Sequence, residues 1–336
     1  MKAVRTAQTG IAHLAVTDLP KPVPQEHEVL IRIKAVSLNY LDIILANGDF
    51  GAALPMPYTP ASDGAGIVEA VGTQVTTWQP GDRVAIHYVQ RWISGNVNAY
   101  TNAVRVAWQT QGVLAEYVCI PAYGLVKIPA YLTYEEAATL PIAGLTAWEA
   151  LINQAGLRIG QTVLTQGTGG VSIFALQLAK AAGARVIATT SSDQKAERLL
   201  QLGADHVINY HTYPEWPDEV KKLTAGEGVD ITLDIAGTAT IDRSIRSVKP
   251  HGFVGTAGFI GGSTITLDIT RHLNLNFTRI QGFAVGNRES FEAMIKAMEV
   301  TQLHPVIDRV FALEEVQAAY QYVADGKHLG KVVITL

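Results

Sequence analysis

Thr162-Val163-Leu164-Thr165-Gln166-Gly167-Thr168-Gly169-Gly170-Val171-Ser172 is the stretch of the sequence that decides the fold. An apolar, strand-like run ends at Gln166, a glycine-rich turn follows, and residues 171–182 are predicted to form a helix. Gly167 and Gly169 match the first two positions of a G-x-G-x-x-G fingerprint, and Ser172 takes the place of the third glycine. In that setting a pyrophosphate meets free N–H groups at the start of a helix, so a dinucleotide is the predicted ligand, with a glycine-rich turn in another α/β protein as the alternative. The residues predicted to hold it are Gly167, Thr168, Gly169, Gly170 and Val171.

Strands and helices alternate after this turn, whereas the first third of the chain has short strands broken by Gly and Pro. The later strands are predicted at 162–166, 185–190, 205–209, 228–235 and 252–257, with a helix at 196–202. Such alternation builds a parallel sheet with right-handed crossovers. The first third, with strands at 28–37 and 66–71 and a turn into a strand at 81–84, is predicted to be all β. Two helices, 289–298 and 313–324, and a strand at 331–336 are predicted to close the chain.

The composition excludes several classes of protein. With 336 residues, 48% of them hydrophobic, the chain exceeds the roughly 250 to 300 residues at which a single core stops growing, so two domains are expected. A net charge of -4 without charged runs argues against nucleic-acid binding. The single cysteine, Cys119, excludes a disulfide framework, and no apolar run approaches the roughly 20 residues that span a membrane. The N-terminal residues lack an apolar signal-peptide core, so we expect a cytoplasmic protein with a small-molecule substrate.

Residues at the end of the strand predicted at 185–190 indicate whether the protein binds NAD or NADP. An acidic residue at this place would bind the ribose 2′-OH of NAD. Here the sequence has Thr189, Thr190, Ser191 and Ser192, with no carboxylate before Asp193 and with Lys195 one turn later. Hydroxyl donors and one cation suit a 2′-phosphate, so NADPH is favoured and NADH stays possible because of Asp193. The alternative is that Ser191 caps the next helix and Lys195 is a solvated surface charge.

Further motifs occur in a fixed order along the chain: Leu38-Asn39-Tyr40-Leu41-Asp42, Ala61-Ser62-Asp63-Gly64-Ala65-Gly66, Gly81-Asp82-Arg83-Val84, Gly112-Val113-Leu114-Ala115-Glu116-Tyr117, Ala143-Gly144-Leu145-Thr146-Ala147-Trp148 and Gly203-Ala204-Asp205-His206-Val207-Ile208-Asn209-Tyr210. With the Gly167 turn, they make the chain resemble the medium-chain dehydrogenase/reductase superfamily, in its zinc-free, quinone-reductase-like branch, over nearly its whole length. The resemblance implies an α/β protein with a GroES-like β-barrel catalytic domain at 1–127 and 284–336 and a Rossmann domain, a doubly wound parallel sheet, at 128–283. It also implies a cleft between the domains where cofactor and substrate meet, and a homodimer formed through Rossmann-domain edges.

The resemblance places further cofactor contacts on this sequence. Thr146 would lie near the nicotinamide, and Tyr210 would pack near the adenosine phosphate together with Lys195. Lys331 would approach a phosphate from the last strand, although a solvated lysine on an edge strand is an equal alternative. Later strand ends would line the cofactor at Gly237, Ala257, Gly258, Phe259, Phe283, Ala284 and Val285, with a simple turn as the alternative for each glycine.

The same resemblance argues against a catalytic metal. In zinc-dependent members the ligands are a Cys, a His and a second Cys, and these positions align with Asn39, Ser62 and Ile142. An amide and a hydroxyl are poor zinc ligands and an isoleucine is none. The structural four-cysteine lobe is equally excluded because the chain has one cysteine. His87 with Asp63 offers another place for a metal, but a lone His after a strand is more typical of a structural residue, so we expect no zinc.

Without a catalytic metal, hydride transfer to a conjugated acceptor is favoured. Reduction of an isolated ketone concentrates charge on one oxygen and calls for a Lewis acid or a proton donor, whereas a quinone or enone spreads that charge. By resemblance Asn39 would reach the nicotinamide ribose or the substrate oxygen. Tyr40 offers a phenolic proton, with a core position as the alternative, and Asp42 is expected to orient by accepting hydrogen bonds. Tyrosines of related quinone reductases are replaced here by Ile44 and Phe50, so the substrate cannot be transferred.

The sequence therefore predicts an NADPH-dependent reductase of quinones or enones. An alcohol dehydrogenase or carbonyl reductase is the alternative of the same class, and an NADPH-binding protein with little turnover is the alternative of another class. The polar, aromatic insert at 90–111, which replaces the cysteine lobe, is expected to cap the substrate cleft or to form a subunit contact.

Overall fold

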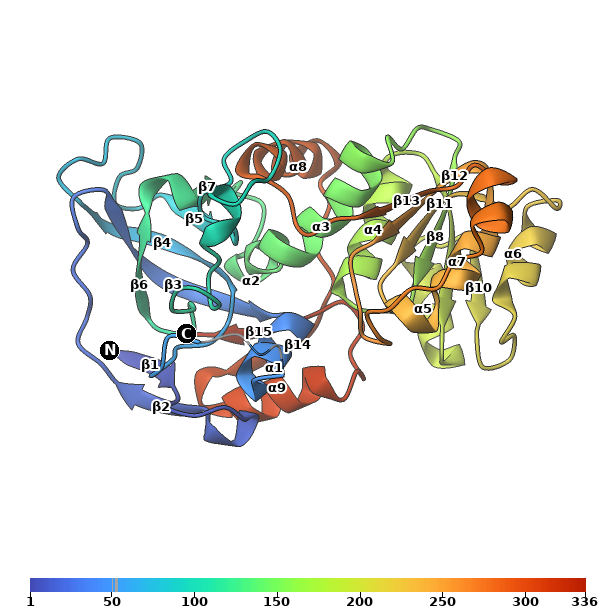
Figure 1. The fold of residues 1–336 in the computed structure, drawn as a ribbon. Coiled ribbons are helices and arrows are strands. Elements are labelled where there is room, and N and C mark those ends of the chain that lie inside the picture. Colours follow the sequence, from blue (N-terminus) through green and yellow to red (C-terminus); the bar gives the residue numbers. More distant parts are fainter. Residues whose placement is uncertain (50, 52–53) are drawn as a thin grey trace. The chain divides into compact units, whose positions relative to one another are not determined.

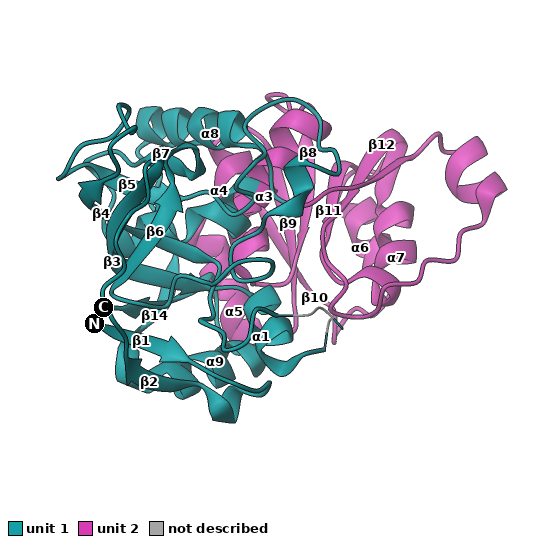
Figure 2. Ribbon diagram, turned by 60° about the vertical axis from the view of Figure 1, so that its left-hand side comes forward, with its two compact units in different colours: residues 1–145, 285–336 teal, residues 146–284 magenta. Residues whose placement is uncertain are grey.

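A computed structural model describes residues 1–49, 51 and 54–336, and the chain divides into two compact units (Figures 1 and 2). Unit 1 comprises Met1–Leu145 and Val285–Leu336, drawn in teal in Figure 2, and unit 2 comprises Thr146–Ala284, drawn in magenta. The first boundary lies later than the 127/128 boundary expected from the sequence. Residues 128–145 join unit 1 because helix α2 (Tyr134–Ala138) packs against strands β3 and β4 of that unit.

Unit 1 is organised around one long strand, β3 (Glu28–Leu38). Val29, Ile31 and Ile33 alternate along it and are almost completely buried, as the predicted period of two requires. One edge of β3 pairs with β4 (Asp63–Val71), while the other edge pairs first with β6 (Tyr117–Pro121) and then with β15 (Lys331–Thr335). The sheet order is β14-β15-β3-β4-β5-β7, with β6 on β3. The C-terminal strand therefore completes the sheet of the N-terminal segment, as the resemblance implies.

The helices of unit 1 and the strands of its sheet enclose one apolar core, which is separate from that of unit 2. The remaining strands of unit 1 are β1 (Lys2–Arg5), β2 (Ala15–Asp18), β5 (Arg83–Ile86), β7 (Leu125–Lys127) and β14 (Ile307–Ala312). Its remaining helices are α1 (Tyr40–Asn47), α8 (Arg288–Thr301) and α9 (Val316–Ala324), with 3₁₀ turns at Ile11–His13, Thr101–Ala103, Ala122–Gly124 and Leu313–Glu315 and a π-helical turn at Leu140–Gly144. A short helix, α3 (Leu145–Trp148), spans the unit boundary.

Helix α1 corrects the prediction that the first third is all β. It begins after Asn39, buries the five consecutive residues 42–46, and ends at Gly48, whose φ of 79° is the left-handed conformation of a helix C-terminus. A short helix that buries five consecutive residues shows no clear amphipathic period, which is why the sequence did not reveal a helix here.

Unit 2 is a six-stranded, all-parallel sheet in the order β10-β9-β8-β11-β12-β13. Its strands are β8 (Thr162–Gln166), β9 (Arg185–Thr190), β10 (His206–Asn209), β11 (Val229–Asp234), β12 (Val248–Thr256) and β13 (Arg279–Gly282). Its helices are α4 (Gly170–Ala181), α5 (Asp193–Gln201), α6 (Trp216–Leu223) and α7 (Ile241–Ser247), with a 3₁₀ turn at Gly237–Ala239 and π-helical turns at Glu149–Gln154 and Ile269–Asn274. This is the predicted doubly wound sheet, and β8 and β9 have the predicted bounds.

The chain changes direction across the sheet between β8 and β11. From β8 it moves outward to β9 and β10, and from β11 it moves the other way to β12 and β13. Right-handed crossovers therefore put α4 and α5 on one face and α6 and α7, which pack together, on the other. The carboxyl ends of β8 and β11 are adjacent at this switch point, where ligands bind in open α/β sheets.

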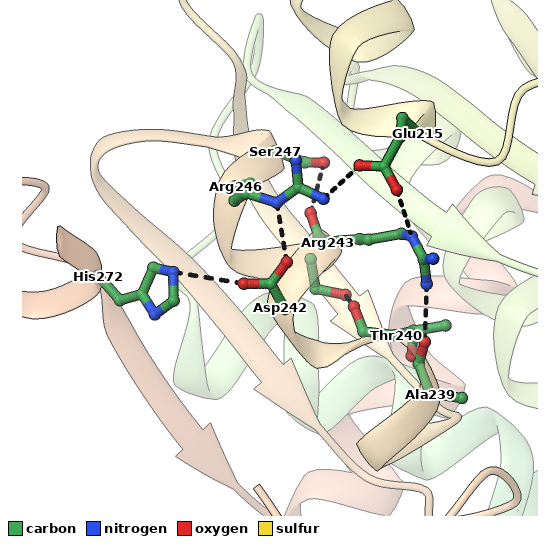
Figure 3. A network of polar contacts seen from close by, with 9 residues as sticks. Glu215, Ala239, Thr240, Asp242, Arg243, Arg246, Ser247 and His272 are labelled. Atoms are coloured by element: carbon green, nitrogen blue, oxygen red, sulfur yellow. Dashed lines mark hydrogen bonds and ion pairs between the residues drawn. The ribbon is translucent and has the colours of Figure 1, made fainter. Parts of the chain in front are cut away.

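A network of charged side chains ties α6, α7 and the segment after β12 together (Figure 3). Arg246 bridges Glu215 at 2.6 Å and Asp242 at 2.8 Å, and Arg243 approaches Glu215 at 3.6 Å. Asp242 also lies 3.4 Å from Nε2 of the buried His272 in the π-helical turn. The carboxylates are more than half exposed, so each pair contributes little stability, and the network mainly fixes the position of this segment.

Within the described residues, no helix has both the length and the apolar content required to cross a membrane.

Candidate functional site

The glycine-rich turn of unit 2 has the geometry expected of an anion-binding loop. Gly167 has a φ of 71°, which a side chain would strain, and a Cβ added at Gly169 would meet no atom within 4 Å. Helix α4 begins directly after Gly169, and the N–H groups of its first turn have no partners within the helix. Ser172, in the place of the third glycine, is buried and donates its hydroxyl to the carbonyl oxygen of Gln166 at 2.5 Å. Strand and helix therefore accommodate the extra hydroxymethyl group through a hydrogen bond.

Sequence reasoning missed the side chain that organises the switch point, Asp234 at the end of β11. Its carboxylate is completely buried and accepts hydrogen bonds from the N–H groups of Ala236 and Gly237 at 3.1 and 2.8 Å. It also accepts from the hydroxyls of Thr240 at 2.8 Å and Ser244 at 2.5 Å. The Ser244 hydroxyl in turn accepts from the amide of Gln166, the last residue of β8, at 2.5 Å. One carboxylate thus joins the turns after two adjacent strands. The sequence signal that could have identified this residue was an Asp at a predicted strand end, shortly before Gly237.

The region predicted to select the dinucleotide lies at the ends of β9 and β10. Thr190 is buried, and Ser192, rather than Ser191, caps α5 by accepting from the N–H of Lys195 at 3.4 Å. The alternative that Ser191 caps the next helix is therefore wrong by one residue.

The two flanking charged residues of this region are also held in place. Lys195 is half-buried rather than a fully solvated charge. Asp193 accepts a hydrogen bond from the side-chain amide of Asn209 at 2.7 Å, so its carboxylate is oriented by β10. Tyr210 follows on the same strand end and is partly exposed, with its ring 5.0 Å from that of His211.

The other predicted cofactor positions of unit 2 are sites of close backbone approach or burial. A Cβ at Gly237 would lie 2.3 Å from the carbonyl oxygen of Gly262, and one at Gly258 would lie 1.9 Å from that of Ile235, so only glycine fits there. Ala257 donates its N–H to the Asp234 carbonyl, and Phe283 donates its N–H to that of Thr256. Thr146 is buried, Phe259 is partly exposed, Ala284 ends unit 2, and Val285, with a φ of 39°, begins the second segment of unit 1.

In unit 1 the structure brings Asn39 together with Lys331, which lies 292 positions later in the chain. The ammonium of Lys331 donates to Oδ1 of Asn39 at 2.6 Å and to the carbonyl oxygen of Leu38 at 2.7 Å. The Nδ2 group of Asn39 donates to Oδ2 of Asp63 at 2.8 Å. Lys331 is only 3% exposed, and β15 lies between β14 and β3. The alternative of a solvated edge-strand lysine is therefore wrong, and the ammonium, expected to approach a phosphate, instead donates to Asn39.

A second carboxylate, that of Asp42, completes this buried cluster. It accepts from the N–H of Asn39 at 2.8 Å and from the N–H and hydroxyl of Ser62 at 3.0 and 2.8 Å, which is the orienting geometry expected from the sequence. Burial raises the pKa of Asp42, against these hydrogen bonds. Burial likewise raises the pKa of Asp63 to about 7, with Lys331 opposing the shift, and lowers the pKa of Lys331, with Asp63 opposing it.

Of the remaining predicted residues of unit 1, one is exposed on α1, one is buried in α1, and one lies outside the described residues. Tyr40 is 41% exposed, so it is not the core residue that the alternative interpretation required. Ile44 is buried in α1, and Phe50 lies outside the described residues. In the insert, Trp92 and Ile93 accept hydrogen bonds through their carbonyl oxygens from the N–H groups of Arg288 and Glu289, which anchors the insert on the start of α8.

The side chains at the positions of the superfamily's zinc ligands do not fit a zinc site. The Asn39 amide is held between a cation and a carboxylate, the Ser62 hydroxyl donates to Asp42, and Ile142 donates its backbone N–H to Asp63 at 3.3 Å. An ammonium 2.6 Å from Oδ1 would repel a zinc ion at that oxygen. Among the residues that the structure describes, no cluster of three or more His, Cys, Asp or Glu side chains could hold a metal.

His87, the alternative metal-binding candidate, is completely buried near Phe291 of α8. Burial lowers its pKa to about 3 from the ordinary 6.5. Between these two values the unfolded chain binds a proton at His87 that the folded protein does not bind, so this residue reduces stability as the pH falls below 6.5.

We predict that His87→Leu protects the protein against mild acid. Between pH 8 and pH 5 the wild type should lose about 2 kcal/mol more unfolding free energy than the variant, because the 1.5 pH units below 6.5 cost about 1.4 kcal/mol each. Urea denaturation of both proteins at the two pH values measures this difference, and each protein at pH 8 serves as its own reference. Equal losses for the two proteins would contradict the assignment of a neutral, buried His87.

Comparison with known proteins agrees with this geometry. Residues 25–130 match the model of the alcohol dehydrogenase GroES-like domain, and residues 170–300 match that of the zinc-binding dehydrogenases. A zinc-type alcohol dehydrogenase-like protein of Schizosaccharomyces pombe is 38% identical over 94% of this chain and 93% of its own. The quinone oxidoreductase of Homo sapiens is 28% identical over 100% and 98%.

Solved structures extend the likeness to three dimensions. A putative alcohol dehydrogenase from Sinorhizobium meliloti 1021 superposes with a TM-score of 0.94 at 40% identity, covering 100% of this chain and 98% of its own. A mycobacterial protein solved in complex with NADPH superposes with a TM-score of 0.84 at 28% identity over 100% of both chains. The two matched domains, the near full-length relatives and the shared fold together show that this chain belongs to the medium-chain dehydrogenase/reductase superfamily of oxidoreductases.

Proposed function

We propose that the protein transfers hydride from NADPH to a quinone or an α,β-unsaturated carbonyl compound without zinc. The observation that carries the proposal is the Asn39 cluster: Asn39 and Ser62, at two of the aligned zinc-ligand positions, are hydrogen-bonded to the carboxylates of Asp63 and Asp42, and Asn39 also to the ammonium of Lys331. Such a cluster supplies hydrogen bonds but no Lewis acid, which suits an acceptor that delocalises its own developing charge. The likeness to quinone oxidoreductases supports the same substrate class.

When bound to unit 2, NADPH supplies the hydride. Gly167, Thr168, Gly169, Gly170 and Val171 would hold the pyrophosphate, and Gly237, Ala257, Gly258, Phe259 and Phe283 would line the cofactor beyond the switch point. Thr146 and Val285 would complete the nicotinamide side. In unit 1, Asn39 would bind the nicotinamide ribose or the acceptor oxygen, Asp42 would orient that side chain, and the exposed Tyr40 would be the nearby phenolic donor.

Several features of the β9 and β10 ends support NADPH over NADH. Thr190, Ser191 and Ser192 offer hydroxyls at the end of β9, Lys195 lies in the first turn of α5, and Tyr210 follows the end of β10. The carboxylate of Asp193, which would otherwise favour NADH, is engaged by Asn209. The NADPH complex of a relative with 28% identity is consistent with this choice.

We predict that Lys195→Met weakens NADPH binding at least about 10-fold, the effect of one lost charge-assisted contact to the 2′-phosphate, and leaves NADH binding unchanged. Fluorescence titration with each dinucleotide measures both dissociation constants. Lys180→Met is the matched control, because Lys180 pairs with Asp205 elsewhere in unit 2 at 2.8 Å. Equal weakening of NADPH and NADH, or a wild-type preference for NADH, would refute the choice of cofactor.

We predict that the wild type oxidises NADPH with 1,2-naphthoquinone or a simple enone about 100-fold or more faster than with the matching saturated ketone, since one oxyanion contact has this effect on rate. Absorbance of NADPH at saturating cofactor gives the rates. Faster turnover of the saturated ketone, or of a simple alcohol with NADP⁺, would favour the alcohol dehydrogenase alternative. Tight NADPH binding without turnover of any acceptor would favour a non-catalytic binding protein.

A homodimer through unit 2 is the second part of the proposal. Strand β13 ends the sheet order of unit 2, and an unpaired sheet edge is a template for pairing with another chain. The segment before it exposes large apolar side chains: Ile260 is 56% exposed, Ile269 62%, Leu275 71% and Phe277 57%. Apolar groups gathered next to a sheet edge favour contact with a second copy.

We predict that Leu275→Asp with Phe277→Asp halves the mass of the particle in solution, because two charges would have to be buried at the interface. Light scattering should give twice the 36.1 kDa chain mass for the wild type and for the control Ile159→Asp, which changes another exposed apolar residue of unit 2. A wild-type mass of one chain, or a double variant that keeps the wild-type mass, would refute this interface. In the latter case the insert at 90–111 becomes the candidate subunit contact.

A further inference from the structure

We propose that Lys331 is a positioning residue that fixes the side-chain amide of Asn39 for hydride transfer. The inference rests on the proposed function, and it assigns to Lys331 a task other than phosphate binding. Three observations carry it: the contacts on the two ends of the amide, the enclosure of the ammonium, and the place of Asn39 in the cluster.

The two ends of the Asn39 amide have opposite partners. A lysine ammonium has three N–H donors and no acceptor, so the atom 2.6 Å from it must be the amide oxygen. On the other side, the carboxylate oxygen of Asp63 accepts from Nδ2 at 2.8 Å. An amide turned by 180° would place its NH₂ group against the ammonium and its oxygen against the carboxylate. The cluster therefore selects one of the two amide orientations.

The ammonium itself cannot easily move away. Lys331 begins β15, whose next residue, Val332, lies opposite Leu38 of β3, and the Leu38 carbonyl accepts a second hydrogen bond from Nζ. Lys331 is 3% exposed, and the carboxylates of Asp42 and Asp63 beside it are fully buried. A buried carboxylate without a compensating charge is costly, so the charges of Asp42 and Asp63 favour an ammonium at this place.

For the reaction, the fixed orientation of the Asn39 amide means that its N–H donor, and not its oxygen, points to one side of the cluster. Hydride transfer oxidises NADPH to NADP⁺, reduces the acceptor by two electrons and leaves negative charge on its oxygen until a proton from the Tyr40 phenol, which solvent then replaces, neutralises it. An amide N–H stabilises that oxygen, whereas an amide oxygen in the same place would repel it. Nδ2 donates to Asp63 at 2.8 Å and to the Ser62 hydroxyl at 3.5 Å, and the second of these is a weak contact that an acceptor oxygen can replace. Lys331 keeps this second N–H, and not Oδ1, available to the acceptor.

A double-mutant cycle on kcat/KM for NADPH and 1,2-naphthoquinone tests the proposal in the full-length protein. Lys331→Met should lower kcat/KM by about 10- to 100-fold, the effect of one hydrogen bond to a charged group. The loss should lie in kcat, with the NADPH dissociation constant unchanged. In an Asn39→Ala background the same change should lower kcat/KM less than about threefold, because Lys331 then has no amide to orient. Lys331→Gln, which keeps an N–H donor, should recover part of kcat and replaces Lys331→Met in the cycle if that variant does not fold.

Two controls separate positioning from general destabilisation. Ser37→Ala removes a buried hydrogen bond to the Val332 carbonyl on the same strand pair, and Lys327→Met removes an exposed lysine of the same segment; both should keep wild-type kcat. An active wild type with additive losses in the cycle, or a Ser37→Ala loss as large as that of Lys331→Met, would overturn the inference alone. A wild type without turnover would overturn the proposed function and the inference with it.

Discussion

The hydrogen-bonded cluster of unit 1 depends on a buried ammonium that donates to Leu38 and Asn39 at the end of β3 and is influenced by the charges of two buried carboxylates. Lys331 contacts the end of β3 and the first side chain after it, while Asp42 and Asp63 supply the compensating charge. Removing an ion from water costs several kcal/mol, so such a cluster persists only when each member has partners of good geometry. The hydrogen bonds of 2.6 to 3.0 Å around Asn39, Asp42 and Ser62 meet that condition.

Unit 2 also contains a buried carboxylate, but no cation stabilises it among the hydrogen bonds described for Asp234. Asp234 is buried at the switch point, and its carboxylate is stabilised by backbone N–H groups and hydroxyls alone. These bonds fix the turn at Gly237–Ala239 and, through Ser244, the strand end that precedes the glycine-rich turn. The two turns that border the expected cofactor position are therefore parts of one hydrogen-bonded network, which limits the reorganisation that binding requires.

Local sequence patterns predicted much of the fold, whereas the candidate site around Asn39 depends on strand pairing between distant parts of the chain. Apolar runs and glycine punctuation gave the bounds of β8 and β9 and the parallel sheet, because strand and turn signals act within a few residues. Helix α1 was missed because burial on nearly all sides hides its period. The place of Lys331 could not be read from its neighbours: it follows from pairing of β15 with a strand almost 300 positions earlier. The Asp234 network likewise needs two strands and a helix assembled.

The chain is an oxidoreductase of the superfamily, and we propose that a hydrogen-bonded cluster takes the place of its metal centre. Turnover of 1,2-naphthoquinone with NADPH by protein dialysed against a strong chelator, with its metal content measured on the same sample, tests this claim most directly. We predict full activity at less than about one-tenth of a zinc ion per chain, whereas an enzyme that depends on a catalytic zinc needs nearly one ion per chain. Activity that disappears on chelation and returns on addition of zinc would contradict it.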